Sequence, residues 1–274
     1  MIIKKKIKNL FLELGESPIW VDHLRKFYFV DIKNPKIYSY QLSESKLETF
    51  TIPFTSSCIV NTRKNLFLLA SGNKIYKTNS EFQEFFELCT INQKYVGTRL
   101  NDGSYDGLGN LWVSGIQSND RNLSSIFKIS SDKKIEIFEK NNIKLGNGID
   151  WSVDKKKMYL NDSKAKTTYI FDFDTTNSRL SNKKNFFDFK DFSGEPDGLT
   201  VDNNGVLWIP IWDQGLVTTI SQNGQFLNCF DFPALRPTSI AFANDNKNTM
   251  LITTAKSDSR QSSDDGSVFL VTNT

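Results

Sequence analysis

Histidine and cysteine are scarce in this chain of 274 residues, which has one histidine and three cysteines. The histidine, His23, lies in the turn-like segment VDHLRKF, where a solvated side chain is its usual role. A single histidine in such a place argues against a Ser-His-Asp hydrolase and against a His-ligated zinc site. The odd number of cysteines, without metal-binding spacing, argues against a disulfide framework and fits a reducing compartment. A cytoplasmic location is therefore expected.

Long apolar runs and a large excess of one charge are absent as well. No segment is long enough to span a bilayer, and the N-terminal MIIKKKIKNLFLEL lacks the continuous apolar stretch of a secretory signal. The 34 basic and 31 acidic residues leave a net charge of only +3. The lysine clusters are short and scattered, as is typical of turns and edge strands rather than of a nucleic-acid surface. We expect neither a membrane nor a nucleic acid as partner.

Three common catalytic or nucleotide-binding motifs are also missing. The chain contains no G-x-S-x-G, no G-x-x-x-x-G-K and no G-x-G-x-x-G, so a nucleophile elbow, a P-loop and a dinucleotide-binding fold lack support. Aromatic residues, in contrast, are plentiful, with 22 phenylalanines and eight tyrosines. This composition favours half-buried, pleated strands.

The strongest positive feature is an internal repeat of about 40 residues. Each unit opens with a polar or glycine-containing corner, continues with a short apolar strand and a turn, and then adds alternating, aromatic-rich strands. Segment 80–88 (SEFQEFFEL) comes nearest to a helix, although its phenylalanine pairs fit an outer strand about as well. The six units begin at Gly15, Ser56, Asn101, Asn147, Pro196 and Pro237.

Six units of about four strands each predict an all-β, six-bladed β-propeller, because one such unit cannot bury both of its faces alone. No Pro/Ser-rich linker divides the chain, so residues 1–274 are predicted to form a single domain. The stretch KIKNLFLEL (6–14) has strand character, and we predict that it closes the ring by pairing with the last blade. The innermost strands of a propeller line its channel, so the residues leading into them should converge on one rim.

Those leading positions carry a specific set of polar side chains. Three of them, Glu16, Asn147 and Asp197, would supply oxygen ligands only. Two carboxylates and one amide suit Ca²⁺, Mg²⁺ or Mn²⁺, or a labile Zn²⁺, with water completing the shell. The alternative is that each residue caps a turn, but their equivalent places in different repeats favour one shared cation site. The full set is Glu16 in GESPIW, Arg99, Asn101 and Asp102 in RLNDG, Asn147 in GNGIDW, and Asp197 in EPDGLTVD.

The sequence resembles the regucalcin, gluconolactonase and luciferin-regenerating enzyme family of metal-dependent propellers. The resemblance covers most of the chain and rests on the order and spacing of several motifs, among them GESPIW, RLNDGSYDGLGNLWVSG, NGIDWSVD, PDGLTVD and PTSIAF. It implies that Glu16, Asn147 and Asp197 bind the metal. It further implies that Asp197 donates and accepts protons, and that Arg99 and Asn101 contact the substrate.

For the remaining motif positions the resemblance implies less. Asp102, Gly103 and Asp106 are expected to be mainly structural, and Asp162 in YLNDS is a candidate acidic residue near the channel. One departure concerns the stretch SGIQSND (114–120), which lacks a glutamate that contacts the substrate in some relatives.

Asn119, or alternatively Asp120, would take the place of that glutamate as a substrate-binding residue. The departure bears on the identity of the substrate more than on the chemistry.

Motifs and resemblance together predict a hydrolase, namely a cation-dependent lactonase acting on a small sugar lactone such as gluconolactone. Ca²⁺ is the first candidate for the cation, which would act as a Lewis acid while Asp197 serves as general acid and base. Two alternatives stay open: a non-catalytic, calcium-binding regulatory propeller, and an enzyme that cleaves a phosphoester or another ester. The expected partner is the small-molecule lactone, and the chain is expected to be a monomer or a weak homo-oligomer.

Overall fold

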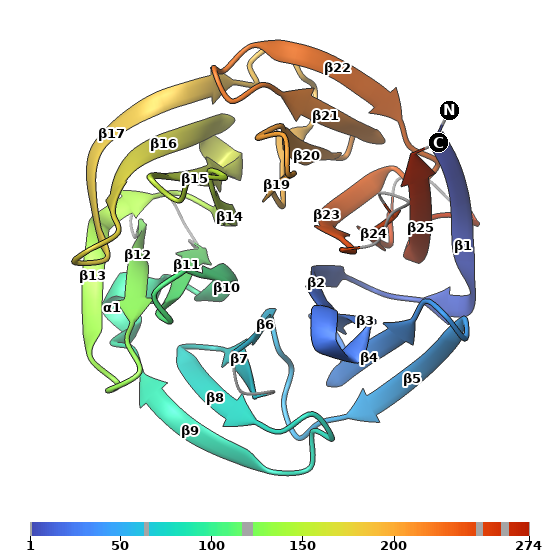
Figure 1. The fold of residues 1–274 in the computed structure, drawn as a ribbon, viewed down its shortest axis with the longest axis horizontal. Coiled ribbons are helices and arrows are strands. Elements are labelled where there is room, and N and C mark those ends of the chain that lie inside the picture. The colour runs from blue at the N-terminus through green and yellow to red at the C-terminus, as the bar shows by residue number, and fades with distance from the viewer. Residues whose placement is uncertain (1, 63–65, 117–122, 245–248, 259–262, 274) are drawn as a thin grey trace.

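A computed structural model describes residues 2–62, 66–116, 123–244, 249–258 and 263–273. Its strands form six antiparallel sheets, which stand as blades around a central axis (Figure 1). The predicted six-bladed, all-β propeller is thereby confirmed. From the axis outward, the first three blades consist of β2 (Gly15–Val21), β3 (Lys26–Asp31), β4 (Lys36–Gln41) and β5 (Lys46–Thr51); β6 (Cys58–Asn61), β7 (Phe67–Ser71), β8 (Lys74–Thr78) and β9 (Phe85–Thr90); and β10 (Arg99–Tyr105), β11 (Leu111–Ile116), β12 (Ser124–Ile129) and β13 (Ile135–Ile143).

The remaining three blades complete the ring, and the fifth has an interrupted inner strand. Two short segments, β18 and β19, both pair with β20 and leave residues 197–199 between them. These blades consist of β14 (Gly146–Trp151), β15 (Lys157–Asp162), β16 (Thr167–Asp174) and β17 (Arg179–Asp188); β18 (Glu195–Pro196), β19 (Thr200–Val201), β20 (Leu207–Trp212), β21 (Leu216–Ile220) and β22 (Phe226–Asp231); and β23 (Arg236–Phe242), β24 (Thr249–Ala255), β25 (Ser267–Asn273) and β1 (Ile2–Phe11).

The N-terminal strand closes the ring. β1 pairs antiparallel with β25, with Lys5 opposite Leu270, and so becomes the outer strand of the last blade (Figure 1). The predicted pairing is confirmed, although the strand begins at Ile2 and ends at Phe11 rather than covering residues 6–14. Both ends of the chain are thus held by one sheet.

The hydrophobic core lies between the blades. Each of six buried clusters takes its side chains from two neighbouring blades. Trp112 of β11 and Trp151 of β14 illustrate this, because both pack edge-to-face on Phe173 of β16 in the cluster between the third and fourth blades. The apolar face of each sheet is therefore covered by the next sheet, as the repeat requires.

Helix is a minor component of the described residues. It comprises α1 (Gln93–Val96) and two 3₁₀ turns, η1 (Asp22–Leu24) and η2 (Ser163–Ala165). The ambiguous segment 80–88 contributes its last residues to β9, as the outer-strand alternative predicted. None of the helices in the described part of the chain has the length and apolar character needed to cross a bilayer.

Candidate metal centre and substrate cavity

The first residues of several inner strands meet in a cavity of about 240 Å³ at one end of the channel. The structure brings together five of the predicted site residues in its wall. The sixth, Asn119, and its alternative, Asp120, lie outside the described residues. The five that line the cavity are Glu16, Arg99, Asn101, Asn147 and Asp197.

These side chains point into the channel because the inner strands are irregular at the positions of these residues. A β-bulge bends a strand and redirects its side chains. In the fifth blade the break is complete, and Asp197 occupies the gap between β18 and β19. In the other site-bearing blades the register shifts between Glu16 and Ile19 (β2), Leu100 and Gly103 (β10), and Gly146 and Ile149 (β14).

Two glycines explain the N-G and D-G pairs of the motifs. A Cβ on Gly148 would lie 2.2 Å from the backbone nitrogen of Leu199, and one on Gly198 would lie 2.8 Å from the carbonyl oxygen of Thr238. Neighbouring inner strands therefore touch directly behind Asn147 and Asp197, and only glycine permits that approach. The close packing fixes the position of both polar residues.

A relay of hydrogen bonds orients the amides. Arg99 Nη1 donates to Asn101 Oδ1 at 2.6 Å and to the carbonyl of Leu100 at 3.0 Å. Asn101 Nδ2 in turn donates to Asn147 Oδ1 at 3.2 Å, and Asn147 Nδ2 donates to Ser163 Oγ at 3.1 Å. A carbonyl oxygen has two lone pairs, so Asn147 Oδ1 keeps one for a further partner.

The two carboxylates are buried and repel each other. Glu16 is 7% and Asp197 4% exposed. Burial and the negative charge of Asp102 raise the pKa of Glu16 to about 8. The hydrogen bond from the Ser17 amide and the positive charge of Arg99 act in the opposite direction but are weaker. Burial, Glu16 and Asp102 likewise raise the pKa of Asp197 well above its ordinary range. Burial also lowers the pKa of Arg99, which both carboxylates raise.

This donor set fits a hard divalent cation. Among the described residues, no three or more His, Cys, Asp and Glu side chains are grouped so that they could hold a metal ion. A cation here would therefore bind the carboxylates of Glu16 and Asp197, the amide oxygen of Asn147, and water. Oxygen-only ligands suit Ca²⁺, Mg²⁺ or Mn²⁺, and a cation would compensate two buried charges that otherwise destabilise the fold.

The metal-free protein should lose stability as the pH rises from about 4.5 to about 8, the ordinary and folded-state pKa values of Glu16. In that interval the folded state holds a proton that the unfolded state has released, so the free energy of unfolding falls with rising pH. The slope from this group is on the order of 1 kcal/mol per pH unit. Urea unfolding in a chelator measures it; Glu16→Gln should flatten the profile, and stability that rises across the interval would contradict the assignment.

Asp162 and Asp106 lie elsewhere and hold loops. Asp162 does not line the cavity; its carboxylate accepts hydrogen bonds from the backbone of Lys144, Leu145 and Ala165. Asp106 accepts hydrogen bonds from Trp112 Nε1 at 3.0 Å, from three donors of its own turn on Leu108 and Asn110, and from Ser178 Oγ of the next blade. These contacts fit a structural role for Asp106 and place Asp162 outside the candidate site.

Four polar or aromatic residues of the cavity were not foreseen, namely Ser163, Lys164, Glu195 and Trp212. Lys164 Nζ donates to Glu195 Oε1 at 2.7 Å, and Glu195 pairs across the sheet with Trp212. Glu195 stands two residues before Asp197, and its strand partner follows from the hairpin register. Sequence reasoning could therefore have found Glu195 and Trp212, whereas Lys164 lies in a 3₁₀ turn without a motif.

The histidine and the cysteines do not line the candidate metal centre. His23 is exposed in η1 and lines neither this cavity nor the one described below. All three cysteines are described, and each is a free thiol.

Comparison with known proteins places the chain in a family. Residues 14–256 match the SMP-30/Gluconolactonase/LRE-like region. Regucalcin of Xenopus laevis is 26% identical over 251 residues, which cover 89% of this chain and 83% of the relative.

Solved structures agree with this placement. A luciferin-regenerating enzyme superposes with a TM-score of 0.90 at 27% identity, covering 100% of this chain and 96% of that one. Regucalcin of Agrobacterium tumefaciens, described as a calcium-binding protein, superposes with a TM-score of 0.89 at 19% identity, covering 98% and 93%. At that identity the likeness shows the fold alone. With the match over residues 14–256, the chain belongs to the SMP-30/gluconolactonase/LRE-like family.

Proposed function

We propose that the protein is a divalent-cation-dependent lactonase that hydrolyses a small sugar lactone. The observation that carries the proposal is one cavity in which the carboxylates of Glu16 and Asp197 face the same space as the amides of Asn101 and Asn147 and the Arg99 guanidinium. The family name includes gluconolactonase. A volume of about 240 Å³ suits a ligand of monosaccharide size better than a polymer.

Glu16, Asn147 and Asp197 would hold the cation, with Ca²⁺ as the first choice and Mg²⁺, Mn²⁺ or Zn²⁺ as alternatives. An all-oxygen set of carboxylates, an amide and water is the ligand type that Ca²⁺ takes, which supports this order. When bound, the cation supplies Lewis-acid chemistry, polarising the lactone carbonyl and stabilising the negative charge that develops on its oxygen.

Asp197 would move the protons. Its carboxylate takes a proton from water while the water oxygen bonds to the carbonyl carbon of the lactone. It returns a proton to the ring oxygen as the bond between that oxygen and the carbonyl carbon breaks, which leaves a hydroxy acid. Burial and the charges of Glu16 and Asp102 raise the pKa of Asp197 in the metal-free protein. A bound cation would offset that repulsion and keep the carboxylate ionised, as a proton acceptor must be.

Arg99 and Asn101 would position the substrate. Arg99 uses Nη1 for Asn101 and the Leu100 carbonyl, and no described residue occupies its Nε or Nη2 groups. Those donors can bind the hydroxyl or ester oxygens of a lactone, and their directed geometry fixes its orientation. A protein that only stores calcium would not need this oriented pair beside its carboxylates.

Base consumption during hydrolysis of D-glucono-δ-lactone tests the proposal. Turnover above the spontaneous rate should disappear when a chelator is added and return when Ca²⁺ or another divalent cation is supplied in excess. Tight calcium binding without turnover of any lactone in a panel would instead identify a non-catalytic calcium-binding propeller.

A further inference from the structure

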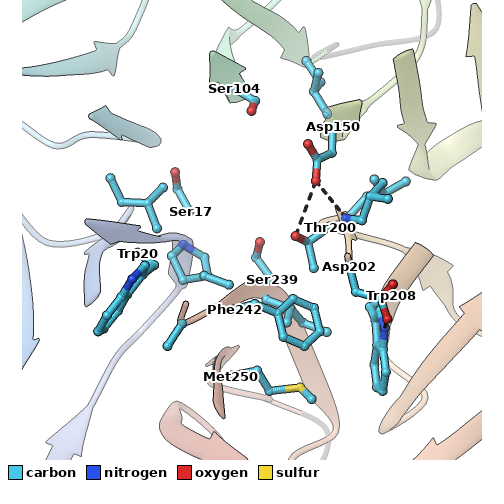
Figure 2. Close-up of a pocket in the computed structure, with 18 of the residues that line it drawn as sticks. Ser17, Trp20, Ser104, Asp150, Thr200, Asp202, Trp208, Ser239, Phe242 and Met250 are labelled. Atoms are coloured by element: carbon cyan, nitrogen blue, oxygen red, sulfur yellow. Dashed lines mark hydrogen bonds between the residues drawn. The ribbon is translucent and has the colours of Figure 1, made fainter. Parts of the chain in front are cut away.

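A second cavity, of about 480 Å³, lies at the opposite end of the same channel. Figure 2 shows the residues that line it. The first cavity uses the first residues of the inner strands, such as Glu16 of β2 and Arg99 of β10. The second uses the last residues of the same strands, including Trp20 of β2 and Ser104 of β10. The two cavities are therefore separate sites on one axis, and the second is twice as large.

Three aspartates line this cavity, and none of them has an ion-pair partner among the described residues. Asp202 accepts hydrogen bonds from its own turn and from Trp208, which leaves Asp102 and Asp150 as the candidates for binding a cation. Asp150 accepts hydrogen bonds from the backbone of Trp151 at 2.7 Å and Val201 at 2.8 Å, and Asp102 accepts one from Gly103 at 2.7 Å. No ion pair joins either carboxylate to a residue in the described part of the chain. Burial raises the pKa of both groups. Half-buried carboxylates without a counter-charge favour a positively charged ligand.

Unused hydroxyl groups point into the same space. Ser239 is only 6% exposed, yet no described residue forms a hydrogen bond with its hydroxyl, and the same holds for Ser104. Figure 2 shows both hydroxyls around the open centre, with Asp150 beside them. The Ser239 and Ser104 hydroxyls are therefore free to form hydrogen bonds with a ligand in this cavity. Carboxylates accept and hydroxyls can accept, so the complementary ligand is a hydrogen-bond donor.

Apolar side chains form the rest of the wall. Trp208 and Phe242 pack edge-to-face with ring centroids 5.7 Å apart, and Met250 lies next to Phe242 in Figure 2. Trp208 Nε1 donates to Asp202 Oδ2 at 3.0 Å, which fixes the indole at the rim. Such a wall suits an aliphatic chain, and aromatic rings also attract ammonium groups.

Positive charge is confined to the outside of this cavity. None of the described residues that line it is a lysine, an arginine or a histidine. The Arg25 guanidinium lies over the Trp20 ring at 5.3 Å, where it is also 3.7 Å from the Asp22 carboxylate. Lys155 is exposed and lowers the pKa of Asp150 from a distance. The interior thus has carboxylates, hydroxyls and apolar groups, but no cation.

We propose that this second cavity binds a primary alkylammonium ligand, whose ammonium group lies against Asp102, Asp150 and the Ser239 hydroxyl while its alkyl chain packs on Trp208, Phe242 and Met250. An ammonium group carries three donors and no acceptor, as this set of acceptors requires. A bare metal ion would leave most of the 480 Å³ and its apolar wall unused. A neutral sugar would leave the two carboxylates uncompensated. Amine binding is measured without any lactone, so the test of this proposal is separate from the test of the proposed function, although Asp102 links the two cavities electrostatically.

Titration calorimetry of the full chain with hexylamine, against hexan-1-ol as the uncharged analogue, tests the proposal. Hexylamine should bind at least about tenfold more tightly than hexan-1-ol, or about 1.4 kcal/mol. Asp150→Asn should weaken hexylamine binding by a similar factor. Ser239→Ala, which removes only an unbonded hydroxyl and leaves the fold intact, should weaken it by about threefold to tenfold. Asp174→Asn removes an exposed turn carboxylate outside the cavity and should change nothing.

Three results would overturn the proposal. Equal binding of hexylamine and hexan-1-ol would mean that charge is not recognised. Undiminished hexylamine binding by Ser239→Ala and Asp150→Asn would place the amine elsewhere. Calcium binding that Asp150→Asn abolishes, without any hexylamine binding, would make this an inorganic cation site. Lactone hydrolysis measured on the same samples separates all of these outcomes from the fate of the first cavity.

Discussion

Asp197→Asn should lower kcat for lactone hydrolysis by on the order of 10² to 10⁴-fold, the range that a positioned general acid or base contributes. The substitution keeps the shape of the side chain but removes the group that would take the proton from water. It also removes one of two candidate carboxylate ligands, so cation affinity should fall as well. Measurement at saturating cation separates the loss of proton transfer from the loss of the metal.

The variant should fold, because backbone contacts hold this position. The Asp197 amide donates to the carbonyl of Pro210 at 3.0 Å, and Asn161 Nδ2 donates to the Asp197 carbonyl at 2.8 Å. Asp191→Asn is the matched control, since Asp191 is exposed on the loop before β18 and its loss should leave kcat unchanged. An Asp197→Asn enzyme with unaltered kcat at saturating cation would remove Asp197 from proton transfer.

The six blades were predictable because each repeat unit has the same order of strands and turns. The predicted starts at Gly15, Asn147 and Pro196 fall within one residue of the starts of β2, β14 and β18. Turn residues at fixed places and period-2 alternation are local signals, and stacking of the units then follows from the need to cover each apolar face. The outer strands were harder to predict, as segment 80–88 shows. One side of an outer strand faces solvent, so its sequence alternates less strictly between apolar and polar residues.

The meeting of Glu16, Asn147 and Asp197 in one cavity was predictable for a different reason. The three residues occupy equivalent positions in separate blades, and rotation about the channel axis brings equivalent positions together. Their distance along the sequence therefore did not matter. That they bind a metal stays a prediction.

The second cavity could not be read from the sequence. Its wall residues follow the bulges of the inner strands, and each bulge inserts a residue that reverses the alternation beyond it. Counting from Glu16 therefore does not give the face on which Trp20 lies. Asp102 shows the consequence: the resemblance implied a mainly structural role, whereas its carboxylate lines this cavity and raises the pKa of both Glu16 and Asp197.

Glu16→Gln should make the metal-free protein more stable and abolish its stabilisation by calcium. Glu16 and Asp197 are both buried in this cavity, and the charge of Glu16 raises the pKa of Asp197. A neutral amide relieves that repulsion, so the midpoint of thermal unfolding in a chelator should rise. Wild-type protein should gain about 2.7 kcal/mol when free Ca²⁺ reaches about 100 times its Kd, and Glu16→Gln should gain little because one of its carboxylate ligands is gone.

Thermal unfolding of both proteins, with chelator and with Ca²⁺, measures the two effects together. Glu13→Gln is the control: Glu13 is three positions earlier, its side chain is 52% exposed, and it pairs with Lys256 at the surface. That change should leave the calcium response intact. A Glu16→Gln protein that still gains the full stabilisation from Ca²⁺ would show that the ion binds elsewhere. Glu16→Gln should therefore stabilise the metal-free protein and also remove its response to calcium. Both effects are expected if Glu16 serves to bind the cation and destabilises the fold when no cation is bound.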